Sequence, residues 1–118
     1  MMYAILCYDH ESDIATWTKE EDDAQIAKLI AVQEGWKARG KLGPVGRLMP
    51  TNAAKTLRKG ASTMVVDGPF AETKEALLGF YVVDCETMEE AVERAKELAA
   101  VSVGRGAYEI RPLMLLRA

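Results

Sequence analysis

Two four-residue motifs of the same kind constrain the fold of this chain more than any other feature. Thr18 to Glu21 and Thr87 to Glu90 each have the pattern of a capping box, in which the threonine hydroxyl and the glutamate side chain satisfy backbone N–H groups at the start of a helix. The first motif precedes apolar residues at helical spacing up to Gly40, which predicts a helix over residues 19–39. The second precedes an apolar stripe opposite charged residues and predicts an amphipathic helix.

Strand-forming segments surround both helices. We expect strands in the opening segment MYAILCYD, near residues 42–48, 53–58, 61–67 and 78–84, and in the closing segment AYEIRPLMLL. This order is typical of an α+β, ferredoxin-like sandwich, in which two helices cover one face of an antiparallel sheet. The 118 residues suit a single domain over 1–118, with enough apolar content to bury an ordinary core.

The strand sequences are apolar on both faces. In GFYVVD, Phe80 and Val82 alternate with Tyr81 and Val83, and TMVVD repeats this pattern. A sheet with one solvated face would alternate apolar with polar residues, so both faces are expected to be covered. A second copy of the chain is the simplest cover, because most soluble oligomers are twofold symmetric. The sequence therefore predicts a homodimer with two sheets packed face to face, a dimeric α+β barrel.

The composition excludes several classes of protein. The formal charge of −3 and the scattered basic residues argue against a nucleic-acid partner. No apolar run approaches the roughly 20 residues that span a bilayer, and no leader is apparent, so we expect no membrane partner and a cytoplasmic location. Cys7 and Cys85 lack metal-ligand spacing and are expected to be buried thiols. We expect no metal and no cofactor.

Polar chemistry is concentrated in the segment DGPFAETKE. Asp67, Gly68 and Pro69 have the composition of a turn, and a well-made turn is the simplest interpretation. The segment then continues with more ionisable groups than a tight connection needs, arranged around one aromatic ring. We therefore consider it as a ligand site, with these residues: Phe70, Glu72, Thr73, Lys74 and Glu75.

The segment DGPFAETKEALLGFYVV resembles the signature of the DGPF subgroup of the YCII-related family. The resemblance extends to MYAILCY, RLMPTNAAKTLR, TMEEAVERAKELA and YEIRP, which together cover nearly the whole chain. It implies a dimeric α+β barrel of ferredoxin-like subunits. Related members are similar to enzymes with a His–Asp pair in a cleft, and DGPF proteins are associated with sigma-factor regulation.

The chain departs from that pattern in one respect. The family histidine would lie on the first helix, but His10, just after the first strand, is the only histidine. The resemblance implies that Asp67, or another carboxylate of the same loop, is the second member of the pair, and His10 serves only if the end of the first strand approaches the 67–75 loop. A solvated loop histidine is the simpler interpretation. Tyr8 and Tyr81 have polar tips that reach a cleft in the functional interpretation and backbone partners in the structural one.

Three functions follow, in order of preference. The first is binding of a small polar or anionic molecule in a cleft between helix and sheet walled by the 67–75 loop. Asp67 or Glu72 would then act in metal-independent acid–base chemistry, and Lys74 would hold an anionic group. The second is a non-catalytic regulatory module whose loop binds another protein. The third is a structural role in which the motif fixes the dimer geometry.

Overall fold

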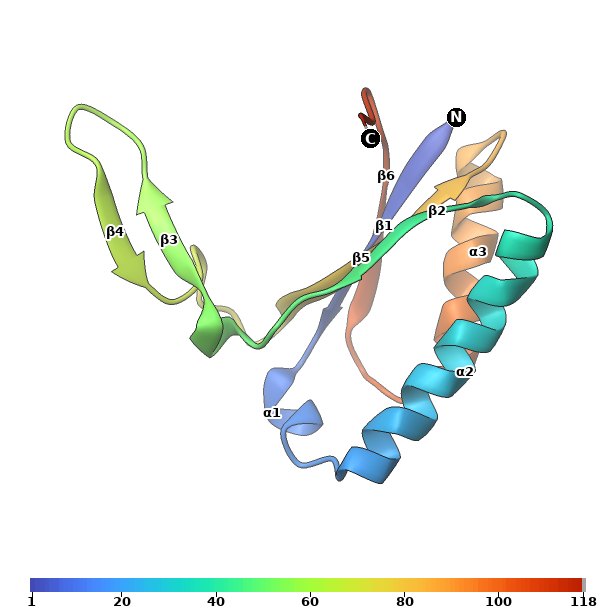
Figure 1. Ribbon diagram of the computed structural model, residues 1–118, viewed down its shortest axis with the longest axis horizontal. Helices are drawn as coiled ribbons and strands as arrows, with labels where there is room; N and C mark the ends of the chain where they lie inside the picture. Colours follow the sequence, from blue (N-terminus) through green and yellow to red (C-terminus); the bar gives the residue numbers. More distant parts are fainter. Residues whose placement is uncertain (118) are drawn as a thin grey trace.

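A computed structural model describes residues 1–117 of the chain. A four-stranded antiparallel sheet has the order β2-β5-β1-β6, and two long helices lie on one side of it (Figure 1). The elements, in chain order, are β1 (Met2–Asp9), α1 (Glu11–Ile14), α2 (Lys19–Ala38), β2 (Leu42–Arg47), η1 (Thr51–Ala53), β3 (Lys55–Arg58), β4 (Met64–Asp67), β5 (Ala76–Asp84), α3 (Met88–Val101) and β6 (Ala107–Pro112). The predicted α+β, ferredoxin-like arrangement is confirmed.

Both predicted helices begin at their threonine caps. The Thr18 hydroxyl accepts from the Glu21 N–H at 3.1 Å and the Glu21 carboxylate accepts from the Thr18 N–H at 3.1 Å, so the first capping box is complete. The Thr87 hydroxyl likewise accepts from the Glu90 N–H, but the Glu90 carboxylate accepts from the backbone N–H of Glu86 instead. The second motif therefore also satisfies two backbone N–H groups, but one of them belongs to Glu86 and not to the capping residue Thr87.

The core lies between the helices and the sheet. Ile5 from β1 and Val83 from β5 face Trp36 of α2 and Leu98 of α3, and none of the four is more than 1% exposed. The Trp36 indole N–H donates to the Glu97 carboxylate at 2.8 Å, which ties the two helices together. Trp36 is thus a core residue.

The opposite face of the main sheet is also apolar. Ala4 pairs with Val82 and Leu6 with Phe80, so these four side chains share that face; Val82 is buried and the other three are half-buried. On the same face, the edge strand β6 carries an ion pair between the Arg111 guanidinium and the Glu109 carboxylate, which are 2.7 Å apart. The doubly apolar character predicted for residues 80–83 is confirmed.

The strands β3 and β4 are not part of the main sheet, although the sequence predicted one antiparallel sheet. They pair with each other as a hairpin, a separate two-stranded sheet that extends away from the main sheet on the side opposite α2 and α3 (Figure 1). The apolar residues of β4 are therefore exposed on both faces rather than part of the main sheet. Local periodicity indicates a strand but not its partner. Two smaller differences are the short helix α1 and the last strand, which ends at Pro112, well before residue 116.

Candidate functional site: a cleft between α2 and the sheet

A cleft of about 390 Å³ lies between α2 and the helix-facing side of the main sheet. Its walls come from the end of β1, the segment before α2, α2 itself, β2, β5, and the α3–β6 loop with the start of β6. This volume is in the range of sites for small molecules. The cleft is lined by Cys7, Asp9, Ile14, Trp17, Asp22, Gln25, Ile26, Leu29, Ile30, Gln33, Val45–Arg47, Leu78–Tyr81, Ser102–Gly104 and Tyr108.

The side walls of the cleft are mostly apolar. Ile26 and Leu29 come from α2, Val45 comes from β2, where it pairs with Tyr81, and Leu78 comes from β5. Trp17, half-buried just before the capping box, lies at the helix end of the cleft. A molecule bound here would therefore be held mainly by contact with its apolar surface.

Two tyrosine hydroxyls supply hydrogen-bonding groups inside the cleft. The Ser102 hydroxyl donates to the Leu98 carbonyl at 2.8 Å, so the Ser102 oxygen accepts from the Tyr108 hydroxyl at 2.8 Å. Tyr108 thus presents lone pairs only. Burial raises the pKa of both Tyr81 and Tyr108, so both phenols stay neutral near neutral pH. Tyr81 consequently remains able to donate its proton in a hydrogen bond.

Asp9 lies in the cleft at the end of β1, in contact with the α3–β6 loop. Its carboxylate accepts from the His10 backbone N–H at 2.8 Å, and its side chain is 16% exposed. A Cβ on Gly104 would lie 2.6 Å from the Asp9 Cγ and 3.0 Å from its Oδ1, well inside contact distance. The absence of a side chain at residue 104 therefore makes the room that the Asp9 carboxylate occupies.

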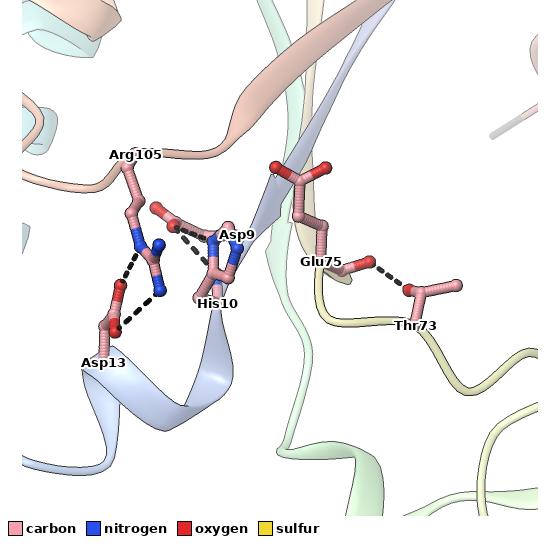
Figure 2. Close-up of polar contacts among 6 residues, drawn as sticks. All are labelled: Asp9, His10, Asp13, Thr73, Glu75 and Arg105. Carbon is pink, nitrogen blue, oxygen red and sulfur yellow. Dashed lines mark hydrogen bonds and ion pairs between the residues drawn. The ribbon is translucent and has the colours of Figure 1, made fainter.

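A polar cluster surrounds this end of the cleft (Figure 2). The His10 Nδ1 lies 3.7 Å from the Asp9 carboxylate and is buried without a hydrogen-bond partner among the described residues. Arg105 binds the Asp13 carboxylate through its Nε at 2.8 Å and its Nη2 at 3.4 Å. That contact holds the pKa of Asp13 below its usual range. Glu75 lies near the end of β1, because the next residue, Ala76, pairs with Asp9.

The same cluster has a metal-like set of ligand atoms. Asp9, His10 and Asp13 each offer one atom within 4.8 Å of the others. The Asp13 carboxylate, however, is already neutralised by Arg105, so a cation there would have to displace a two-point ion pair. The arrangement is therefore better suited to holding the α3–β6 loop against α1 than to holding a metal.

Gln25 and Arg47 fix the mouth of the cleft. The Gln25 amide donates to the Val101 carbonyl at 2.8 Å and accepts from the Val103 N–H at 3.0 Å, which fastens the α3–β6 loop to α2. The Arg47 guanidinium makes two hydrogen bonds to the Asp22 carboxylate, at 2.9 and 3.2 Å, and fastens β2 to the same helix. Both walls of the cleft are therefore held by polar contacts at its rim.

The structure brings some of the sequence-predicted site residues to this place. Tyr81 lines the cleft, and His10 and Glu75 lie beside its end. Tyr8 lines a neighbouring hollow of about 320 Å³ between α3 and β6, which shares Asp9 and Tyr108 with the cleft.

The other predicted residues lie outside the cleft lining. Asp67 is 87% exposed and pairs with Lys55 at 2.6 Å, and Phe70 lies beneath the Arg58 guanidinium, 4.9 Å from its ring centre. Glu72 and Lys74 are exposed, while the Thr73 hydroxyl donates to the Glu75 carbonyl. The 67–75 loop therefore does not wall the cleft within one chain, because it follows the outward hairpin.

Several residues of the site escaped the sequence analysis. In the sequence, Asp9 is simply the last residue of the first strand-forming segment, and Arg105 is a single charge between two glycines in the segment VGRG. The available signal was the position of Asp9 beside the single histidine, together with two glycines that flank a lone arginine. That combination indicates a close backbone approach but does not say what approaches.

Cys7, which also lines the cleft, predicts a loss of stability at alkaline pH. Burial, with a smaller contribution from Asp9, raises the pKa of its thiol from 9.0 to about 11. The folded state therefore retains a proton that the unfolded chain loses above pH 9, so the contribution of Cys7 is complete below that pH and lost as the pH rises to about 11. After allowance for partial exposure we expect a loss of about 1–2 kcal/mol.

Urea unfolding of wild type and Cys7→Ala over this pH range measures the effect, since only the wild type carries the thiol. The two proteins should differ in the slope of unfolding free energy against pH. Equal slopes would show that the alkaline loss comes from other groups.

Comparison with known proteins places the chain in a family. A model of the YCII-related domain matches residues 1–117. The uncharacterized protein R00369 from Rhizobium meliloti (strain 1021) is 52% identical over 118 residues, which cover 99% of this chain and 95% of the relative.

A solved structure has a similar fold. It is 5-chloro-2-hydroxyhydroquinone dehydrochlorinase (TftG) from Burkholderia phenoliruptrix AC1100, in complex with 2,5-dihydroxybenzoquinone. The TM-score is 0.54 at 16% sequence identity, and the match covers 96% of this chain and 93% of that protein. At this identity the likeness concerns the fold. The family match and the close relative, which both span essentially the whole chain, show that the protein belongs to the YCII-related family.

Proposed function

We propose that the cleft binds a small hydroxylated ring compound and that Asp9 exchanges a proton with it. The observation that carries this proposal is the convergence of a carboxylate and a neutral phenol on one apolar cavity of about 390 Å³. Apolar walls accept the faces of a ring, and the polar groups meet its substituents. The similar fold of an enzyme bound to a dihydroxybenzoquinone supports the choice of ligand class.

The chemistry follows from the protonation states in the cleft. Tyr81 is kept neutral by burial and donates a hydrogen bond to a carbonyl or developing oxyanion of the ligand. Asp9 accepts a proton from a ring hydroxyl and returns it in a later step, which is general acid–base catalysis. Cys7 is held as a neutral thiol by its raised pKa and is therefore a poor nucleophile. This assignment places the acid–base role on Asp9 rather than on Asp67 or Glu72.

Matched variants test the proposal. We would measure thermal shifts with 2,5-dihydroxybenzoquinone, hydroquinone and catechol, because a ligand at 100 times its dissociation constant stabilises the native state by about 2.7 kcal/mol. Asp9→Asn should abolish turnover of a bound compound, whereas Asp67→Asn removes an exposed carboxylate outside the cleft and should leave turnover unchanged. Loss of turnover in Asp67→Asn alone would contradict the assignment, and no shift with any of the three compounds would contradict the ligand class.

We also propose that the chain forms a homodimer through the open face of its main sheet. Leu6 and Phe80 on that face are only half-buried in one chain, and Val82 lies between apolar neighbours. A second copy would remove this apolar surface from water. Light scattering that gives only the 13.0 kDa mass of one chain at micromolar concentration would contradict the proposal.

A second candidate function is supported by one observation in the 67–75 loop. Phe70 is 72% exposed, although large aromatic side chains are usually buried or engaged in an interface. A regulatory protein that binds the loop would cover this ring. Phe70→Ala should then abolish binding of that protein while thermal shifts from ring compounds in the cleft remain unchanged.

A further inference from the structure

The β3–β4 hairpin has more exposed apolar surface than its own chain covers. Leu57 and Val65 are directly opposite each other on one face and are 58% and 63% exposed. Met64 and Val66 on the other face are also exposed. A two-stranded ribbon alone is marginally stable in water and needs a surface to pack against.

The base of the hairpin is nevertheless held firmly. The Thr51 N–H donates to the Glu11 carboxylate at 2.8 Å, and the Thr51 hydroxyl makes a second bond to the same group at 2.5 Å. The Gly68 N–H donates to the Ala54 carbonyl at 2.8 Å and closes the hairpin at the same end. The hairpin is therefore presented in a fixed direction, on the side of the main sheet away from the helices (Figure 1).

The charges of the hairpin are opposite to those of the rest of the chain. Residues 55–67 contain Lys55, Arg58 and Lys59 and a single acidic residue, Asp67, so their formal charge is +2. Because the whole chain has a formal charge of −3, the remainder has −5. The surface that best complements the hairpin is therefore acidic and partly apolar.

We infer that the hairpin of each copy packs on the body of a second copy of this chain. The body of that copy has the required negative charge, and the apolar open face of the main sheet lies on the side to which the hairpin extends. Twofold symmetry makes the contact reciprocal, so each chain both gives and receives a hairpin. This contact is separate from packing of the two sheets and removes the apolar ribbon from water.

Cross-linking between isotopically distinct copies locates the contact. Equal amounts of ¹⁴N-labelled and ¹⁵N-labelled protein are mixed and treated with a zero-length carbodiimide, which joins lysines to nearby carboxylates. We expect peptides that join Lys59 of one isotope to an acidic residue of the other. Lys59 links only within single copies would overturn the inference.

Sedimentation equilibrium measures the strength of the contact. The double variant Leu57→Glu/Val65→Glu should raise the dimer dissociation constant about tenfold or more, and Lys59→Glu, a fully surface change, should raise it as well. Val103→Glu is the matched control, because Val103 is 68% exposed but lies in the α3–β6 loop. A dissociation constant unchanged in both hairpin variants would overturn the inference. A wild type that stays monomeric would also overturn it, and would mean that a different partner covers the hairpin.

Discussion

Replacing Trp36 by alanine should destabilise the protein by about 3–5 kcal/mol, the usual cost of emptying a large buried site. Trp36 is 1% exposed, lies edge-on to the Tyr81 ring at a centroid distance of 6.4 Å, and joins α2 to α3 through Glu97. The substitution removes both the packing and the interhelical hydrogen bond. Because α2 is one wall of the cleft, ligand binding should weaken in parallel.

Circular dichroism during urea unfolding is the appropriate measurement, since the change removes a fluorescent side chain. Trp17→Ala is the control: Trp17 is half-buried at the end of the cleft, so its loss should cost much less stability while still weakening ligand binding. Equal losses of stability in the two variants would show that Trp36 does not anchor the core.

Gly104→Ala should cost about 1–3 kcal/mol, the range for forcing extra atoms into a packed site. The new Cβ would occupy the space of the Asp9 carboxylate, 2.6 Å from its Cγ. The cost should largely disappear when Asp9 is also alanine, because the clashing atoms are then gone, and a double-mutant cycle measures this coupling. Ligand binding should be lost in Gly104→Ala even at temperatures at which the variant is folded.

Gly35→Ala supplies a control of opposite sign. Gly35 lies inside α2, and a Cβ there meets nothing within 4 Å, so alanine should stabilise the helix by about 0.5–1 kcal/mol. If Gly104→Ala costs the same with or without the Asp9 carboxylate, the glycine serves the backbone of the loop and does not position Asp9.

The two long helices and the order of the strands around them could be predicted because their signals are local. Thr18 and Thr87 cap the two helices, and the φ of +70° at Gly40 permits the turn that ends α2. These features depend on residues within a few positions of each other. The alternation of apolar residues over 80–83 likewise predicts that both faces of this strand are apolar, irrespective of the partner strand.

The candidate site could not be predicted in the same way, because its residues meet only after folding. The Asp9 carboxylate occupies space left by Gly104, and Gln25 is hydrogen-bonded to residues 101 and 103, so these contacts span most of the length of the chain. The density of charges after Asp67 indicated a site, but the fold directs that loop outward with the hairpin. The pattern of an isolated hairpin is the same as that of two central strands, so sequence periodicity does not separate them.

A titration of ¹⁵N-labelled protein with a ring compound that gives a thermal shift, followed in two-dimensional ¹H–¹⁵N spectra, tests the central claim most directly. The claim is that the small-molecule site is the cleft between α2 and the sheet. The account predicts that the largest shifts occur at the backbone amides of Gln25, Gly46, Gly79 and Gly104, which surround the cleft. Shifts confined to residues 67–75, with those four amides unmoved, would contradict it.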